Sequence, residues 1–195
     1  MCASGAFFAE GPGYRLRAFT LDDVPALAAF SEDENYWRFL SHGPRTPEQV
    51  HSFIETAMKT SQLPDGKERW WAVVDPHADV LIGTANLKQI GDAEDCFGSA
   101  GCSLAPTAQG RGLGPILGWD VIALAFDRFG FAKVECTCAE PNERSVHIMR
   151  HTVGLTYEGI RVTEGDGPRN PWPVHVFSLT ENEFRTKQNP THREG

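Results

Sequence analysis

The residues most suited to chemistry form a glycine-rich turn near the middle of the chain, just before an apolar stretch typical of a helix. Amide groups at the start of a helix, together with the helix dipole, favour a bound phosphate. Glycine lets an anion approach the backbone closely because it has no Cβ, and an arginine in the turn adds a charge-assisted contact. The pattern predicts a phosphate-binding turn, although glycines that merely begin a helix would look the same. The residues are Gln109, Gly110, Arg111, Gly112, Leu113 and Gly114.

Two common phosphate-binding patterns do not match this turn. A Walker loop requires a lysine and a hydroxyl residue after its last glycine, and neither follows here. A dinucleotide fingerprint requires a third glycine where this chain has Pro115. The strands expected before the turn are separated by short polar turns, which predicts an antiparallel meander rather than a Rossmann sheet.

A third pattern matches over several segments. Residues 103–114 resemble the R/Q-x-x-G-x-G/A signature of the GNAT superfamily and are most similar to its RimJ/RimL-like branch. Residues 135–146 are similar to the family's next strand and its P-x-N-x-x-S/A helix start, and residues 153–159 to its L-G-F-x-x-E-G segment. Residues 16–23 resemble the opening R-L-R motif of that branch. The resemblance spans roughly residues 14–180 and implies an N-acetyltransferase that uses acetyl-CoA as co-substrate and no metal.

The resemblance also implies which residues bind the cofactor. The backbone around Leu104 is expected to pair with the pantetheine arm, and the turn amides are expected to hold the pyrophosphate. Asn142 is expected to bond the cofactor near its sulfur, at a position that equally suits a simple helix N-cap. The full expected set is Leu104, Gln109, Gly110, Arg111, Gly112, Leu113, Gly114 and Asn142.

The catalytic residues are less clearly marked. Many GNAT members have a tyrosine that protonates the leaving thiolate, but Met149 stands at that position. Ser145, three residues after Asn142, matches the serine of the RimL-like variant and is the candidate donor, unless it only bonds locally at the helix start. Glu135 is a candidate general base, or else an ordinary surface glutamate. His147 and His151 have the i, i+4 spacing of some metal ligands, but without a third ligand nearby a solvated helix face is favoured.

Hydrophobic periodicity predicts the elements that position these residues. A hydroxyl cap followed by acidic residues or proline marks helix starts at Thr20 and Thr46. We expect an α+β protein with the GNAT fold: a mixed, mostly antiparallel sheet of about six or seven strands, splayed at its centre and flanked by about four helices. Strands are expected near 14–19, 69–74, 80–87, 97–104, 133–138, 155–162 and 174–179, and helices near 20–28, 46–57, 115–126 and 142–151.

Composition limits the class of protein. The chain has 195 residues and a net charge of −8, which argues against nucleic acid as a partner. No apolar run is long enough to cross a membrane and residues 1–8 do not resemble a signal peptide. Five cysteines, including the i, i+2 pair Cys136 and Cys138, are expected to be reduced and to pack as small apolar groups, which fits the cytoplasm. We expect one domain over 1–195, with its core at about 14–180, a polar tail at 184–195, and a monomer or homodimer.

The acceptor is left open between three hypotheses. The first two are acetylation of a peptide or protein N-terminus and acetylation of a small amine, and the third is a non-catalytic acyl-CoA-binding module. The acidic stretch 31–35 would attract a cationic amine, unless it is an ordinary solvated loop. Aromatic residues expected at the acceptor cleft, or else in the core, are Tyr36, Trp37, Phe39, Trp70, Trp71 and Trp172.

Overall fold

All described strands of the chain belong to one twisted sheet. The computed structural model describes residues 8–62, 67–90, 96–163 and 171–187. The strand order is β1-β2-β3-β4-β5-β6-β8-β7, and every neighbouring pair is antiparallel except β5 and β6. The strands are β1 (Ala9–Gly11), β2 (Tyr14–Arg17), β3 (Glu68–Val74), β4 (Leu81–Ile90), β5 (Phe97–Leu104), β6 (Lys133–Ala139), β7 (Thr156–Thr163) and β8 (Trp172–Thr180).

The described part of the chain contains eight strands, one or two more than expected. The additional strand is β1, which pairs with β2 across a tight turn at Gly13, where φ is +88°. A three-residue strand is too short to show an alternating pattern, so hydrophobic periodicity does not predict it. The fold class and the mostly antiparallel order are confirmed.

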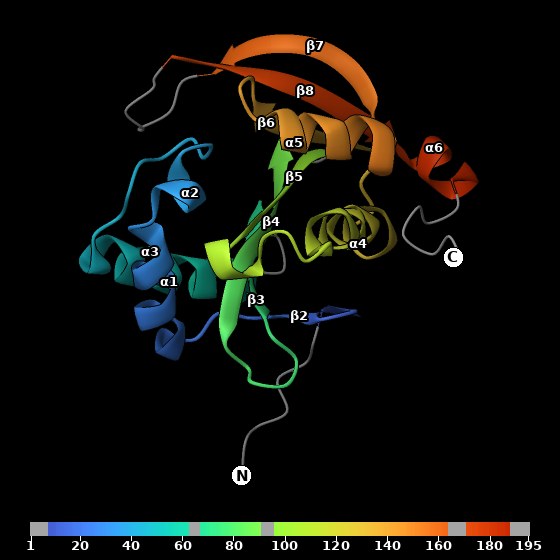
Figure 1. Cartoon of the computed structure of the whole chain (residues 1–195). Helices are drawn as coiled ribbons and strands as arrows, with labels where there is room; N and C mark the ends of the chain where they lie inside the picture. The colour runs from blue at the N-terminus through green and yellow to red at the C-terminus, as the bar shows by residue number, and fades with distance from the viewer. Residues whose placement is uncertain (1–7, 63–66, 91–95, 164–170, 188–195) are drawn as a thin grey trace.

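The helices lie on both faces of the sheet (Figure 1). α1 and α3 pack on one face and α4 packs on the other. α3 begins at a reciprocal cap, as predicted: the Thr46 amide donates to Gln49 Oε1 at 2.9 Å, and the Gln49 amide donates to Thr46 Oγ1 at 3.3 Å. The helices are α1 (Val24–Ser31), α2 (Glu34–Trp37), α3 (Pro47–Gln62), α4 (Leu113–Asp127), α5 (Glu143–His147) and α6 (Glu181–Thr186); short 3-10 turns η1 (Leu21–Asp23) and η3 (Pro106–Ala108) precede α1 and α4, and a π turn, η4 (Ile148–Thr152), follows α5.

The sheet opens between its two central strands. β5 and β6 pair in parallel only from Phe97 to Ser99 and from Lys133 to Glu135. Beyond that point β5 continues beside β4, while β6 continues beside β8. The edge of β5 from Gly101 to Leu104 therefore has no partner strand on its β6 side among the described residues, and the predicted splay is confirmed.

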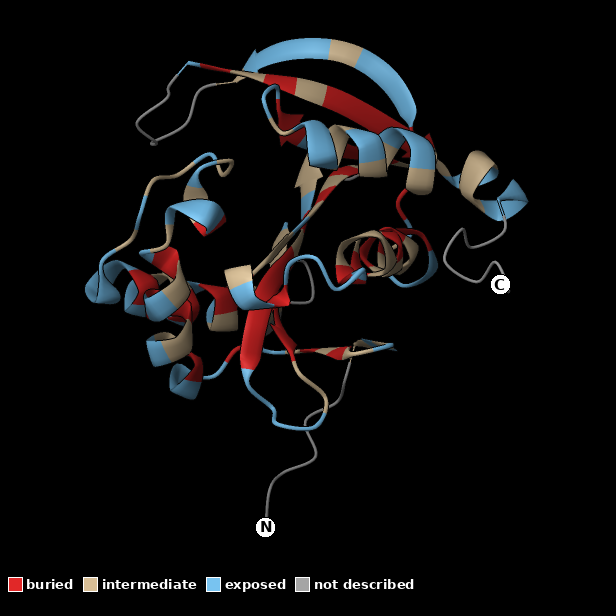
Figure 2. Cartoon of the chain, viewed as in Figure 1, coloured by how far each residue is buried: buried red, intermediate tan, exposed pale blue. Residues whose placement is uncertain are grey.

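Two buried clusters hold the layers together (Figure 2). The larger cluster lies between α4 and the sheet and includes the fully buried Trp71 and Leu117. The smaller lies under α1 and α3 and includes Val50 and Ile54. Trp70 is on this second face, where its ring meets that of Phe53 edge-on at 5.0 Å. The two adjacent tryptophans thus point to opposite faces of the sheet, as strand geometry requires.

The predicted polar tail begins later than residue 184. Thr180 and Glu183 cap each other's backbone amides and start α6, which continues through Thr186. The ring of Phe184 stacks on that of Phe126 at 4.9 Å, so this residue belongs to the packed structure. Residues 188–195 of the expected tail lie outside the described part of the chain.

Among the described residues, no helix has both the length and the apolar character that crossing a membrane requires. Among the described cysteines, Cys102, Cys136 and Cys138 are free thiols. Cys136 and Cys138 are buried on one face of β6, as predicted. Cys2 lies outside the described residues.

Candidate functional site

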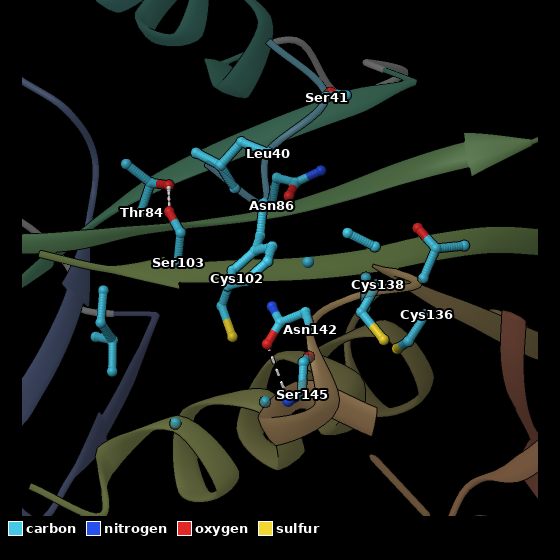
Figure 3. A pocket seen from close by; sticks show the side chains of 18 of the residues that line it. Leu40, Ser41, Thr84, Asn86, Cys102, Ser103, Cys136, Cys138, Asn142 and Ser145 are labelled. Atoms are coloured by element: carbon cyan, nitrogen blue, oxygen red, sulfur yellow. Dashed lines mark hydrogen bonds between the residues drawn. The ribbon is translucent and has the colours of Figure 1, made fainter. Parts of the chain in front are cut away.

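A cavity of about 690 Å³ lies where β5 and β6 separate. Its walls come from β4, β5, β6, α4, α5 and the loop between α2 and α3. Figure 3 shows its centre, with Thr84 and Ser103 on one side, Cys136 and Cys138 on the other, and Asn142 and Ser145 beside α4. The cavity therefore brings together residues from Leu27 to Val174, which lie far apart in the sequence.

The glycine turn opens into this cavity at the N-terminus of α4. Gly110 and Gly112 both have φ of +78°, a left-handed conformation that side chains rarely adopt. Gly112 is the N-cap of α4, and no side chain caps the first turn of that helix among the described residues. A Cβ added at Gly110, Gly112 or Gly114 would meet nothing within 4 Å. The turn therefore presents open backbone to the cavity, and this geometry fits a pyrophosphate.

Two turn residues differ from their expected roles. The Gln109 amide donates to Ala105 O at 3.2 Å and to Pro106 O at 3.3 Å, so it closes the 3-10 turn and is not free for a phosphate. Arg111 is exposed and is not among the residues that line the cavity. It lies close enough to Asp75 to contribute to the lowered pKa of that carboxyl, which the His77 amide lowers most. Any contact of Arg111 with a bound anion would therefore be made from the rim.

The Leu104 backbone lies at the open edge of β5, as expected. Its carbonyl accepts the Gln109 side-chain amide at 3.0 Å, which ties the glycine turn to the strand. Leu113 and Gly114 line the cavity beside it, and so does Gly118, one helical turn further along α4. Gly118 was missed in the sequence, although a glycine inside an apolar helix usually has a packing or functional reason.

Asn142 and Ser145 lie at the start of α5 and face the cavity (Figure 3). Asn142 Oδ1 accepts the Ser145 amide at 3.2 Å, so the predicted N-cap is present. The cap uses only the oxygen of the Asn142 side chain, and no hydrogen bond of its Nδ2 is seen among the described residues. The same side chain can thus cap α5 and donate a hydrogen bond into the cavity.

Three thiols line the cavity and all are protonated at neutral pH. Burial raises the pKa of Cys136 to about 12 and that of Cys102 to about 11. Cys102 is exposed where it lines the cavity. Burial also raises the pKa of Cys138, and a hydrogen bond with the Ser145 side chain acts in the opposite direction. The Ser145 hydroxyl therefore lies against Cys138.

Glu135 is not brought to the cavity. The residue is 8% exposed and does not line the cavity wall. Arg161 of β7 binds both carboxylate oxygens, donating from Nη1 at 3.1 Å and from Nη2 at a shorter distance. This hydrogen bonding raises the pKa of Arg161. A carboxylate held in this way is poorly placed to accept a proton from a substrate, because proton abstraction requires hydrogen-bond reach.

A chain of hydroxyl groups lines the opposite side of the cavity. Tyr36 Oη lies 3.0 Å from Ser103 Oγ, which lies 2.9 Å from Thr84 Oγ1. Burial raises the pKa of Tyr36, so its phenol stays neutral. These groups adjoin the open edge of β5 and can orient a polar substrate.

His42 and Arg45, on the loop before α3, are two functional candidates that no sequence pattern marked. His42 lines the cavity, and burial lowers its pKa, with a smaller contribution from the charge of Arg45. Its Nδ1 lies 2.8 Å from the Gly43 carbonyl. A carbonyl can only accept, so Nδ1 carries the proton and Nε2 keeps a free lone pair. Neither residue belongs to a motif, and only the fold brings them to the cavity.

The aromatic residues expected at the acceptor cleft are divided between the cavity wall and other positions. Tyr36, Phe39, Trp70 and Trp172 line the cavity, whereas Trp37 does not and Trp71 is buried on the α4 face. Of the acidic stretch 31–35, only Ser31 and Asn35 reach the wall. Asp33 caps α2 by accepting the Asn35 amide at 2.8 Å.

The histidine pair, with His147 at the end of α5 and His151 on η4, lies at the surface. The ring centroids of His147 and His151 are 5.0 Å apart, and both residues are exposed. Within the described ranges, no group of three or more His, Cys, Asp or Glu side chains is arranged to hold a metal ion.

Three features together define a class of coenzyme A-dependent acyltransferases. They are a mixed sheet that splays at its centre, a glycine turn without a side-chain cap at the opening, and a capped helix opposite that turn. The sequence profile of the Acetyltransferase (GNAT) domain matches residues 14–153, and the chain belongs to this family. It is accordingly an acetyl-CoA-dependent N-acetyltransferase. Comparison with curated protein sequences finds no match.

Solved structures share the fold at low sequence identity. RimL, a ribosomal L7/L12 α-N-protein acetyltransferase in complex with coenzyme A, has a TM-score of 0.76 and 15% identity, covering 91% of this chain and 99% of that one. A spermidine N-acetyltransferase from Vibrio cholerae, in complex with CoA and spermine, has a TM-score of 0.74 and 19% identity, covering 89% and 99%. An acetyltransferase of the GNAT family from Bacillus anthracis has a TM-score of 0.73 and 17% identity, covering 91% and 100%.

Proposed function

We propose that the cavity between β5 and β6 binds acetyl-CoA and a primary amine together, and that the amine attacks the thioester directly. The observation that carries this proposal is the uncapped, open glycine turn of α4 at one end of a cavity that continues along the free edge of β5. Family membership gives the reaction class, and the geometry supports one site for both substrates.

The cofactor would lie along the opening in an extended arrangement. The amides of Gly110 to Gly114 would hold the pyrophosphate, with Arg111 contributing from the rim. The backbone of Leu104 and the Asn142 side chain would bond the pantetheine arm. Gly114 and Gly118 support close approach, because neither puts a side chain between α4 and the cavity.

Proton transfers would be made by two side chains of the cavity. Bound acetyl-CoA supplies an acetyl group activated as a thioester. His42 Nε2 would take the proton that the amine must lose when its nitrogen bonds the acetyl carbon. Ser145 would donate a hydrogen bond to the sulfur that leaves when the C–S bond breaks. The Ser145 hydroxyl lies against Cys138, and its O–H can rotate to point into the cavity instead.

We propose a structural role for Glu135 rather than a catalytic one. Its pairing with Arg161 joins β6 to β7 across β8 and supports a structural role in holding that side of the opening. We therefore propose His42, in place of Glu135, as the general base.

The acceptor is proposed from two neighbouring activities. RimL acetylates a protein N-terminus and the Vibrio cholerae enzyme is a spermidine N-acetyltransferase. Both substrates are primary amines, so a peptide or protein N-terminus and a small-molecule amine are the candidates. We also propose that the protein is a cytoplasmic monomer or homodimer and that it binds neither nucleic acid nor a membrane. The free thiols support the cytoplasm, and the net charge of −8 argues against nucleic acid.

The test combines calorimetry with a thiol-release assay. Acetyl-CoA should bind one site per chain, and a panel of peptide and small amines should release free coenzyme A with at least one acceptor. Tight binding without release on any amine would instead indicate a non-catalytic acyl-CoA-binding module.

A further inference from the structure

Arg45 is a cavity residue with no acidic partner among the described residues. Arg45 lies on the loop before α3, and its guanidinium stacks on the Phe53 ring at 4.6 Å. Among the described residues, no carboxylate forms an ion pair with it. Burial lowers its pKa, because desolvation disfavours the cation. A partly desolvated cation without a partner is costly, and an anion that enters the cavity would offset that cost.

The cavity wall around Arg45 is cationic although the chain is acidic. The other charged side chains that line it are Arg38, Arg144 and Glu68. The Glu68 carboxylate accepts the Trp70 indole N–H at 3.1 Å and is thereby held beside that ring. The acidic residues of the 31–35 stretch lie outside the wall. This distribution of charge favours an anion in the cavity and disfavours a polycation.

Arg45 lies on the acceptor side rather than the pyrophosphate side. Its stacking partner Phe53 packs against Trp70 on the α1 and α3 face of the sheet, whereas α4 covers the opposite face. The charge of Arg45 reaches Tyr36, whose hydroxyl bonds Ser103 next to the open edge of β5. An anion bound by Arg45 would therefore lie near the thioester end of the opening.

We propose that the acceptor carries a carboxylate close to its primary amine, and that Arg45 binds this carboxylate. The proposal rests on the acetyl-transfer function above and narrows its acceptor. A guanidinium presents a planar set of donors that matches a carboxylate with two parallel hydrogen bonds. The stacked Phe53 ring holds that plane in place, so an acceptor anchored at Arg45 presents its amine to the hydroxyl groups of Tyr36 and Ser103.

The experiment measures kcat/KM for matched pairs of amines that differ in one charge. β-Alanine is compared with β-alaninamide, and an N-terminal aspartyl dipeptide amide with its asparaginyl counterpart; spermidine represents the polycations. The member with the carboxylate should be preferred at least roughly tenfold, because a hydrogen bond to a charged partner adds that much. The pair with the larger preference distinguishes a free amino acid from a peptide N-terminus.

Variants then assign the preference to one residue. Arg45→Gln should abolish the preference of kcat/KM for the acid over its matched amide without weakening acetyl-CoA binding, and Arg45→Lys should retain part of that preference. The control is Arg128→Gln, since Arg128 also stacks on a phenylalanine, at 4.8 Å from the Phe8 ring, but lies outside the cavity. Arg128→Gln should change neither the preference for the acid nor the affinity for acetyl-CoA.

Three outcomes would overturn the proposal. Faster turnover of spermidine or of the neutral amides would do so while leaving acetyl transfer intact. Weaker acetyl-CoA binding by Arg45→Gln would assign Arg45 to the cofactor. Acetyl-CoA binding with no turnover of any amine would overturn the acetyl-transfer function as well.

Discussion

At the scale of single residues, the chemistry of the cavity depends on side chains whose protonation is set by burial. The thiols of Cys102 and Cys136 and the phenol of Tyr36 all have raised pKa values, so they remain neutral near pH 7. His42, whose pKa is lowered, is also neutral there. Neutral donors and a neutral base suit a reaction in which an uncharged amine must attack.

Ser145→Ala tests the proposed donor to the sulfur. We expect kcat to fall by about ten- to a hundredfold, since general acid–base groups contribute on that order or more. The KM for acetyl-CoA should change little, because the backbone of residue 145 still caps α5 through Asn142. Steady-state kinetics measure both, with the exposed Ser52→Ala as control. An unchanged kcat would remove Ser145 from the mechanism.

If His42 is the general base, kcat/KM should depend on pH in a particular way. The pKa of His42 lies below the ordinary value of 6.5, and only its neutral form can accept a proton. Once divided by the fraction of uncharged amine, kcat/KM should therefore be constant above about pH 6.5 and fall as the pH drops through the lowered pKa of His42. His42→Gln should lower kcat/KM at neutral pH and remove this acid-side decline. A variant that keeps the wild-type pH profile would show that another group accepts the proton.

At the scale of elements, the features that are local in sequence were the predictable ones. The Asn142 cap, the Thr46 cap and the glycine turn each depend on neighbouring residues, and all are present in the structure. The positions of His42 and Arg45 depend on how the loop between α2 and α3 folds against the cavity, which no periodicity encodes. Glu135 was misplaced because Arg161, on β7 and beyond β8, decides where its carboxylate points.

Gly98→Ala tests how closely β5 packs near the parallel pairing. A Cβ there would lie 2.0 Å from Phe131 Cε2 and 2.7 Å from the Lys88 carbonyl oxygen. We expect the free energy of unfolding to fall by about 1–3 kcal/mol, as overpacked sites typically lose. Urea denaturation measures it, and the same change combined with Phe131→Ala should cost less than the sum of the two. Full additivity would contradict this contact.

At the scale of the whole molecule, the opening exists because the two halves of the sheet share a short seam. Three residue pairs join β5 to β6, and the helices on either side must hold the rest of the opening in place. α4 packs against β5 and contacts β6, and α6 attaches to α4 through Phe184. The cavity is thus bordered by elements that also join the two halves.

Phe184→Ala tests the attachment of α6. The Phe184 ring lies 5.2 Å from that of Trp119 and 4.9 Å from that of Phe126. Because the ring is only partly buried, its removal should cost about 1–3 kcal/mol, less than the 3–5 kcal/mol typical of a fully buried phenylalanine. Thermal or urea unfolding measures this loss. Leu21→Ala, at a side chain that is 47% exposed, should change stability by less than about 0.5 kcal/mol.

The central claim is that the open N-terminus of α4 binds the diphosphate of acetyl-CoA, and Gly114→Ala tests it most directly. A Cβ at this helical position meets nothing within 4 Å, and alanine is favoured over glycine in a helix by up to about 1 kcal/mol. The variant should therefore melt at the same or a higher temperature while binding acetyl-CoA at least roughly tenfold more weakly by calorimetry, because the methyl group stands where the anion approaches. Wild-type affinity in a variant that folds normally would contradict the claim.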